Sequence, residues 1–443
     1  MYQLRIPPQD VRRTLTKHIQ TDGLDLVLDL EKSQGVYAYD SAHERNLLDF
    51  FTCFASMPLG YNHPAMVNDE SFRNNLLLAA LTNPSNSDIY TQQYAEFVDT
   101  FSRVGIPDYL PHAFFIAGGG LAVENALKTA MDWKVQKNFQ KGHLREKGTK
   151  VIHFENAFHG RTGYTMSLTN TLPDKTKWYA RFDWPRVTTP GIEFPLTEER
   201  QEALLKKEKL ALRQIKLAFK NNPDEICAII VEPILSEGGD IHLRVEFFEA
   251  LRNLADENEC LLIYDEVQTG VALTGKFWCH EHFGEKARPD ILAFGKKMQV
   301  CGILAGPKID EIETNVFRVP SRINSTWGGN LTDMVRASQI LRIIEQDRLS
   351  EHAASTGAYL HERLQAIADS SEKVRNVRGR GLLNAFDLPD TAMRNRFIAN
   401  GLKHGALFLG CGERTIRFRP SLIMEKKHID AGMEIVERVL REL

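Results

Sequence analysis

The sequence predicts an α/β protein that consists of a large domain with a mostly parallel sheet and a smaller α+β domain. From about residue 110, short apolar runs alternate with helical stretches, which is typical of a parallel sheet covered by helices. After about residue 331 two helical stretches are followed by short strands, and 443 residues are too many for one compact core. We expect an N-terminal segment (1–60) that packs with the small domain, a large domain (61–330) and a small C-terminal domain (331–443).

The predicted elements follow in chain order. Strand-like runs lie at 24–30 and 47–51 in the N-terminal segment. In the large domain, strands are expected at 112–117, 150–154, 226–231, 261–264, 291–294 and 301–305, with helices at 121–134 and 245–257 among the stretches between them. In the small domain, helices are expected at 332–346, 349–369 and 426–442, and strands at 381–386, 406–409 and 415–418. Functional residues are expected directly after the strands of the large sheet, because ligands bind beyond the carboxyl ends of such strands.

The composition is that of an ordinary globular protein. Hydrophobic residues make up 43% and charged residues 26%, and the formal net charge is −3. No basic excess indicates a nucleic-acid surface or a membrane surface, and neither partner is expected. The six cysteines form no CxxC pair, and no clustered histidines and cysteines indicate a metal site. The first residues contain no apolar run like that of a signal peptide, so a cytoplasmic protein is expected.

Asp265 ends the apolar run of LLIYDEVQTG (261–270). A carboxylate there can pair with a protonated ring nitrogen, which makes pyridoxal phosphate an electron sink. The alternative that involves no cofactor is that Asp265 caps a nearby helix. A nucleotide-binding ATPase is the distant one, because Gly270, Gly275 and Lys276 match GxxxxGK. Phe277 then stands where the magnesium-binding hydroxyl should be, and the phosphate loop should precede the Asp strand, so this alternative is rejected.

Lys296 follows another apolar run (291–294) and Gly295. A lysine that forms a Schiff base must reach the cofactor from a rigid element, and burial helps its amine to lose its proton. Lys297 is a direct competitor, and two adjacent lysines commonly form a solvated face. The strand that ends at Phe294, the turn at Gly295 and the spacing from Asp265 favour Lys296.

Glycines and an aromatic residue follow two other strands. The amides of Gly119 and Gly120, at the start of a helix, suit a phosphate, although a GGG turn also serves tight packing. Phe158 could lie flat on a planar ring, and Arg161 could bind a substrate carboxylate; a core aromatic beside a surface arginine is the alternative. Thr326 offers a hydroxyl to a phosphate, or it belongs to a turn before the helix that follows.

Arg417 lies in the middle of an apolar strand in ERTIRFRPSL (413–422). Burial of an unpaired guanidinium is costly, so an anion is expected nearby. Arg419 faces the same way, and spacing alone does not separate the two arginines. Glu232 and Glu237 follow a strand, and either could pair with an arginine.

In this order, DEVQTG, the strand followed by GK, TWGGN and IRFRP resemble the class III (omega) aminotransferases of fold type I, over roughly residues 20–440. The resemblance implies a homodimer with shared active sites and pyridoxal 5'-phosphate as cofactor. It also implies these roles: Lys296 as the Schiff-base lysine, Asp265 at the pyridine nitrogen, Phe158 on the ring face, Val267 behind the ring, Gln268 at the ring hydroxyl, Gly119 and Gly120 at the phosphate, and Thr326 as a phosphate ligand from the second subunit.

Within the class, segments such as AFHGRTGYTMSLTN (157–170) and PSRINSTWGGNLTDMVR (320–336) resemble the L-lysine 6-aminotransferases. This implies transfer of the terminal amino group of L-lysine to 2-oxoglutarate. Arg161 would bind the α-carboxylate of lysine, Arg417 that of 2-oxoglutarate, Glu237 would neutralise Arg417 when lysine is bound, and Asn324 would shape the pocket. Leu235, Ser236 and the loop Gly118–Gly120 depart from the class pattern, so ornithine or 4-aminobutyrate remains an alternative donor.

Overall fold

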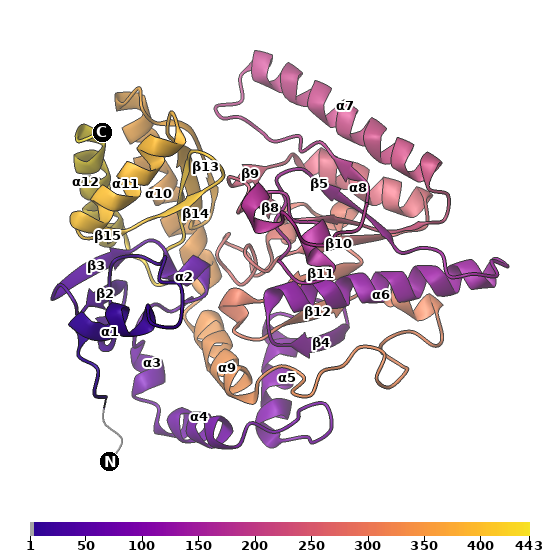
Figure 1. The fold of residues 1–443 in the computed structure, drawn as a ribbon, viewed down its shortest axis with the longest axis horizontal. Helices are drawn as coiled ribbons and strands as arrows, with labels where there is room; N and C mark the ends of the chain where they lie inside the picture. The colour runs from indigo at the N-terminus through magenta and orange to yellow at the C-terminus, as the bar shows by residue number, and fades with distance from the viewer. Residues whose placement is uncertain (1–3) are drawn as a thin grey trace.

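The computed structural model describes residues 4–443, and its centre is a seven-stranded sheet (Figure 1). The strand order is β4 (His112–Ile116), β12 (Cys301–Ala305), β11 (Ile291–Phe294), β10 (Leu261–Asp265), β7 (Ile226–Val231), β5 (Lys150–Phe154) and β6 (Arg186–Val187). Strand β12 is antiparallel to both of its neighbours, and the other pairings are parallel. The predicted mostly parallel sheet is therefore confirmed.

The strands of this sheet are nearly continuous apolar runs because helices cover both of its faces. One face packs against α6 (Gly119–Gln140) and the other against α8 (Val245–Glu257), each within its own cluster of buried side chains. Four strands, β5, β7, β11 and β12, have the bounds predicted from their apolar runs. Helix α6 begins earlier and ends later than predicted.

Three long helices of this part are not among the predicted elements. They are α4 (Glu70–Thr82), α5 (Gln92–Val104) and α7 (Glu198–Asn221). Helix α7 lies on the outside of the molecule (Figure 1), and 11 of its 24 side chains are charged. The short elements β8 (Ile234–Leu235), β9 (Ile241–His242) and α3 (Pro64–Val67) complete this part.

The C-terminal part contains a four-stranded antiparallel sheet in the order β13 (Arg375–Arg380), β14 (Leu383–Asp387), β17 (Thr415–Phe418) and β16 (Leu409–Cys411). It is accompanied by α10 (Leu349–Ser370), α11 (Thr391–Lys403) and α12 (Lys426–Arg441). Strand β13 was not predicted. Its sequence, RNVRGR, has no apolar run, because arginine side chains occupy three of its six positions.

The N-terminal residues lie against this C-terminal part (Figure 1). After α1 (Pro8–Leu15), strands β1 (Leu28–Gln34), β2 (Tyr37–Asp40) and β3 (Arg45–Asp49) form a sheet that ends with β15 (Ala406–Leu407). The strand predicted at 406–409 is thus divided between two sheets, with β15 in one and β16 in the other. Val36, Leu48 and Phe50 share a buried cluster with residues of α10 and α12.

Helix α9 (Leu331–Gln346) packs on α4 and α5, and its apolar side chains belong to the cluster of the large sheet. Leu349 and Ala353 of α10 belong to the same cluster, so the predicted domain boundary at residue 330 stays a prediction. In the described part of the chain, no helix has the length and apolar character that crossing a membrane requires.

Candidate active site

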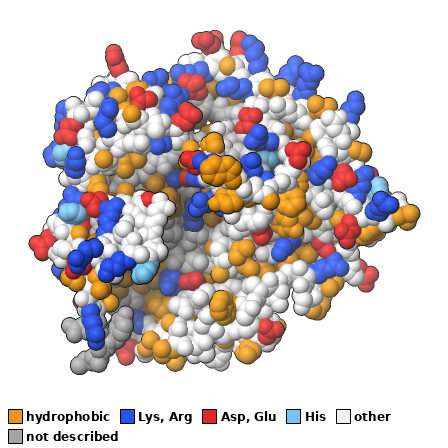
Figure 2. Space-filling view, in the orientation of Figure 1, with side chains coloured by type: hydrophobic (Ala, Val, Ile, Leu, Met, Phe, Trp, Pro, Cys, Tyr) orange, Lys and Arg blue, Asp and Glu red, His pale blue; other side chains and the backbone are white. Residues whose placement is uncertain are grey.

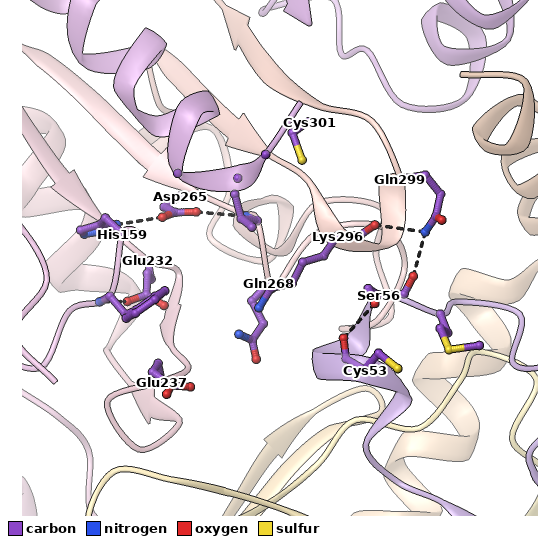
Figure 3. A pocket seen from close by; sticks show the side chains of 17 residues that line it. Cys53, Ser56, His159, Glu232, Glu237, Asp265, Gln268, Lys296, Gln299 and Cys301 are labelled. Carbon is purple, nitrogen blue, oxygen red and sulfur yellow. Dashed lines mark hydrogen bonds and ion pairs between the residues drawn. The ribbon is translucent and has the colours of Figure 1, made fainter. Parts of the chain in front are cut away.

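A cavity of about 730 Å³ lies at the carboxyl edge of the large sheet (Figure 3). Most of its lining residues follow β4, β5, β7, β10 and β11, the arrangement expected for a ligand site of a parallel sheet, and Cys53, Ser56 and Met57 come from the segment after β3. Figure 2 shows that the face of the molecule is hollowed between the N- and C-terminal elements and the large sheet. The lining comprises Cys53, Ser56, Met57, Gly118, Gly119, Gly120, Phe158, His159, Gly160, Glu232, Glu237, Asp265, Val267, Gln268, Lys296, Gln299 and Cys301.

Lys296 lines this cavity from the short 3-10 helix Lys296–Met298 that follows β11. Its backbone has φ +48°, a left-handed conformation that costs a non-glycine residue about 1–3 kcal/mol and occurs mainly at functional sites. The Gln299 side chain donates to the carbonyls of Lys296 at 3.2 Å and of Ser56 at 2.7 Å, which holds the turn. Gly295 is required because a Cβ there would lie 2.8 Å from Cys301 Sγ.

The surroundings of Lys296 favour its neutral amine. Burial lowers the pKa of Lys296 to about 8, and the nearby Arg417 guanidinium acts in the same direction. A primary amine with this pKa is partly deprotonated near neutral pH and can act as a nucleophile or as a base.

Lys297 is turned away from the cavity. Its side chain is buried, and Nζ donates to the backbone carbonyl of Gln268 at 2.7 Å. Burial lowers the pKa of this amine well below its usual value. The structure therefore distinguishes the two lysines by position, with Lys296 in the cavity and Lys297 under the strand-to-loop turn after β10.

Asp265 is the last residue of β10 and is held at both carboxylate oxygens (Figure 3). One oxygen accepts from the backbone amide of Val267 at 3.0 Å, and the other contacts His159 Nδ1 at 2.8 Å. His159 is buried, and its Nε2 has no hydrogen-bond partner among the described residues. His159 therefore orients Asp265.

Gly119 and Gly120 are the first two residues of α6, so their amides lie at the positive end of the helix dipole. A Cβ on Gly119 would lie 2.9 Å from Val267 Cγ1, and one on Gly120 would lie 3.3 Å from Thr162 Cγ2. The glycines thus make a cradle that larger residues would fill. With Asp265 and Lys296 in the same cavity, this donor set fits pyridoxal phosphate, which carries a phosphate, a ring nitrogen and an aldehyde.

Glu232 connects the loops that follow β5 and β7 by hydrogen bonds. Its carboxylate accepts from the amides of Phe158 at 2.9 Å and of Ser236 at 3.1 Å. Burial raises the pKa of Glu232 to about 7. Of the two glutamates predicted as arginine partners, this one binds backbone amides, and it fixes Phe158 at the cavity wall.

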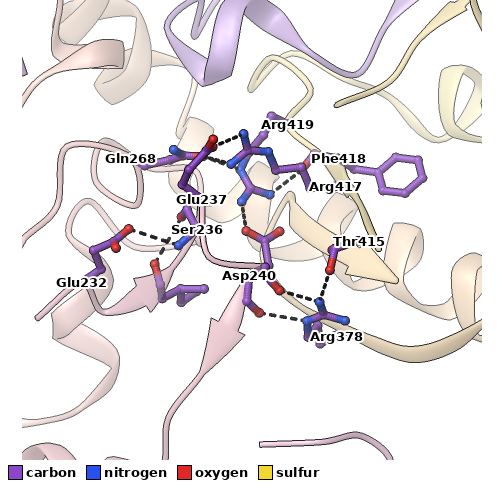
Figure 4. Close-up of polar contacts among 12 residues, drawn as sticks. Glu232, Ser236, Glu237, Asp240, Gln268, Arg378, Thr415, Arg417, Phe418 and Arg419 are labelled. Atoms are coloured by element: carbon purple, nitrogen blue, oxygen red, sulfur yellow. Dashed lines mark hydrogen bonds and ion pairs between the residues drawn. The ribbon is translucent and has the colours of Figure 1, made fainter. Parts of the chain in front are cut away.

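Arg417 has the anion that its burial requires (Figure 4). Its guanidinium donates to Glu237 Oε2 at 2.7 Å and to Gln268 Oε1 at 3.2 Å. Arg419 is also buried, but it forms an ion pair with Asp240 in the loop after β8. The contacts thus separate two arginines that sequence spacing left equivalent, because only Arg417 pairs with a carboxylate of the cavity lining.

Four predicted site residues do not line this cavity, namely Arg161, Asn324, Thr326 and Arg417. Arg417 is buried and contacts the lining residues Glu237 and Gln268, whereas the other three lie away from these contacts. Arg161, Asn324 and Thr326 are exposed. Thr326 lies in a turn that is held by the segment 85–87, where Ser85 Oγ donates to its carbonyl at 2.5 Å and Ser87 Oγ donates to the carbonyl of Ser325 at 2.7 Å. The cavity of a single chain is therefore built without the threonine hydroxyl that the resemblance assigns to a second subunit.

Four consecutive residues near the cavity, Thr52–Ala55, were missed by the sequence reasoning. All have positive φ, so the chain makes a left-handed turn without a single glycine. Asp49 supports the turn by accepting from the amides of Phe51 and Thr52, and the Phe54 ring centroid lies 6.0 Å from Lys296 Nζ. The left-handed residues themselves, TCFA, include no Gly, Pro, Asn, Asp or Ser that could have revealed this conformation.

The model of the family described as "Aminotransferase class-III" matches residues 19–440. The chain is 49% identical to the L-lysine-epsilon aminotransferase of Mycobacterium tuberculosis, over 98% of this chain and 96% of that protein. It is 46% identical to the protein of the same name from Streptomyces clavuligerus, over 96% and 93%. The solved structure of a lysine aminotransferase from M. tuberculosis in the internal aldimine form superimposes with a TM-score of 0.95 and 49% identity, covering 98% of this chain and 99% of that one.

Proposed function

The chain belongs to the class III aminotransferases, and we propose that it transfers the ε-amino group of L-lysine to 2-oxoglutarate. The products are 2-aminoadipate 6-semialdehyde and L-glutamate. The enzyme has fold type I and uses pyridoxal 5'-phosphate. The observation that carries the choice of substrate is the 49% identity, over 98% of the chain, to a relative that bears this name.

The roles proposed for the cavity residues follow from their positions. When bound, pyridoxal phosphate supplies the carbonyl carbon that takes up the amino group and the ring that withdraws electrons. Lys296 Nζ, whose pKa burial lowers to about 8, moves a proton from the ε-carbon of the substrate in its neutral form. Asp265, oriented by His159, holds the proton on the ring nitrogen. The amides of Gly119 and Gly120 bind the phosphate, and Phe158 and Val267 enclose the ring.

The proposed substrate contacts are made mainly by charged side chains that bind or replace the substrate carboxylates. Arg161 would bind the α-carboxylate of lysine and Arg417 that of 2-oxoglutarate, with Asn324 at the pocket wall. Glu237 would neutralise Arg417 while lysine is bound, and the 2.7 Å ion pair between the two side chains supports this role. The loop at Leu235 and Ser236, which departs from the class pattern, carries Glu237, and it is the place where a different donor preference would arise.

A panel of amine donors with 2-oxoglutarate as acceptor tests the proposed substrate. L-Lysine is expected to be the best donor, ahead of ornithine and 4-aminobutyrate. Loss of one charge-assisted carboxylate contact costs about 1.5–3 kcal/mol, so Arg161→Ala is expected to raise the KM for lysine by roughly 10- to 150-fold. Arg200→Ala, on the outer helix α7, is the control. Turnover of ornithine without lysine, or an unchanged lysine KM in Arg161→Ala, would contradict the assignment.

We further propose that two copies of the chain form a dimer with shared active sites. Helix α4 and the segments next to Thr326 expose a group of large apolar side chains, namely Leu77, Leu78, Leu81, Ile89, Tyr90 and Trp327. Leu81 is 75% exposed and Trp327 is 54% exposed. Large exposed apolar patches mark association surfaces, and this one adjoins the threonine that the cavity of one chain does not contain.

Light scattering is expected to give about twice the chain mass of 50.4 kDa. Leu81→Asp should shift the protein towards a monomer that holds its cofactor less tightly, because the Thr326 contact would be lost. Leu144→Asp, at a site that is 97% exposed and elsewhere on the chain, should leave the dimer intact. A wild-type monomer with full activity would contradict the proposal.

We also propose a cytoplasmic location, which agrees with six free thiols, five of them buried.

A further inference from the structure

Glu237 has two cationic partners, one for each carboxylate oxygen. Arg417 Nη2 lies 2.7 Å from Oε2, and Lys175 Nζ lies 2.7 Å from Oε1. The Arg417 side chain is fully buried, and those of Glu237 and Lys175 are 25% and 20% exposed. The carboxylate therefore bridges a deep cation in the C-terminal part and a shallower one at the rim of the cavity.

Lys175 contacts two residues of the cavity lining, Glu237 and Phe158. It ends the 3-10 helix Pro173–Lys175, in the segment between β5 and β6, and Nζ lies 5.0 Å from the centroid of the Phe158 ring. Neither the sequence motifs nor the roles proposed above involve this residue.

The space around Glu237 allows its side chain to turn. A second hollow of about 240 Å³ adjoins the main cavity, and both Lys175 and Glu237 line it. The backbone, in contrast, is fixed: the Gly412 amide donates to the Glu237 carbonyl at 3.0 Å, and Gly238 packs so closely on Asn156 that a Cβ would meet its carbonyl oxygen at 2.2 Å. Movement is thus confined to the side chain.

We infer that Lys175 is a specificity-determining residue that retains the Glu237 carboxylate when the carboxylate of 2-oxoglutarate takes its place on Arg417. The inference rests on the proposed function. A half-buried carboxylate that leaves one partner without gaining another is costly, and Lys175 supplies the partner that remains. Glu237, Arg417 and Lys175 together carry one net positive charge, which one incoming carboxylate balances.

The pKa of Glu237 agrees with this double pairing. Burial acts to raise the pKa of its carboxyl, but Arg417 and Lys175 together outweigh burial, and the pKa lies below its usual value. The carboxylate is therefore charged at neutral pH while it pairs with both cations.

Lys175→Met tests the inference, with Lys177→Met as the matched control. Lys177 is an exposed lysine of the same segment and pairs with Asp174. A partly exposed ion pair contributes up to about 1 kcal/mol, so Lys175→Met is expected to raise the KM for 2-oxoglutarate by roughly 3- to 5-fold. The KM for lysine and the melting temperature should remain unchanged. Calorimetric titration of the holoenzyme with glutarate, a non-reacting dicarboxylate, should show the same loss of affinity.

Combining Lys175→Met with Glu237→Gln distinguishes the possible causes of a raised KM for 2-oxoglutarate. If Lys175 acts through Glu237, Lys175→Met should lose most of its effect in the Glu237→Gln background. A full effect in that background would mean that Lys175 contacts substrate directly, and an equal rise in the lysine KM would show a general role; either overturns the inference. The glutarate titration does not depend on the amine donor, so it tests Lys175 even if lysine fails as a substrate.

Discussion

Lys296→Ala is expected to abolish transamination and the visible absorption band of the bound cofactor. The substitution removes the amine that is proposed both to attach the cofactor and to move the substrate proton. General acid–base catalysis alone contributes about 10²–10⁴-fold, so a fall in kcat of at least about 10⁴-fold is expected. Absorbance spectra of the purified variant with added pyridoxal phosphate, together with single-turnover kinetics, provide the measurement.

Lys297→Met is the matched control because it changes the neighbouring lysine and preserves most of its volume. It removes the hydrogen bond to the Gln268 carbonyl, so a lower melting temperature with an intact absorption band is expected. In the wild type, the band should form faster as pH rises through about 8, since only the neutral amine of Lys296 attacks the cofactor. Loss of the band in Lys297→Met, with its retention in Lys296→Ala, would contradict the assignment.

The sequence predicts the large sheet well because its strands are buried on both faces. Runs such as ICAIIV, which forms β7, have no other stable location in a soluble α/β protein, and their bounds coincide with their apolar residues. Strand β13 escapes prediction because its arginines are satisfied by tertiary contacts. Arg378, for example, donates to the carbonyls of Gly239 and Asp240 and to Asp387. The sequence pattern does not reveal these tertiary hydrogen-bond partners.

The residues of the candidate site also differ in whether the sequence alone predicts them. Asp265 and Lys296 are predictable because each directly follows an apolar strand. Arg417 and Arg419 are not separable in this way, because a period of two places both on one face, and only the positions of Glu237 and Asp240 separate them. The roles of Arg161 and Thr326 rest on resemblance alone, since neither residue lines the cavity of one chain.

Asp265→Asn is expected to lower kcat on the order of 10³-fold while the cofactor remains bound. Removal of one preorganised electrostatic group at a reacting centre costs about 10²–10³-fold, and asparagine keeps the shape but cannot hold the ring-nitrogen proton by its charge. The phosphate cradle at Gly119 and Gly120 and the attachment at Lys296 are untouched, so the loss should appear in kcat and not in cofactor content. Stopped-flow measurement of the lysine half-reaction, with cofactor content determined in parallel, distinguishes the two.

His159→Gln is expected to lower kcat less than Asp265→Asn does, because His159 acts only through Asp265. Its Nδ1 contact at 2.8 Å fixes one carboxylate oxygen, while the Val267 amide still holds the other. The aspartate therefore keeps its charge and part of its orientation, and a fall of roughly 10-fold is expected, about one lost hydrogen bond to a charged group. In Asp265→Asn the second substitution should add little, since the carboxylate that His159 orients is gone. Independent, multiplicative losses would show that His159 acts on the cofactor by a separate route.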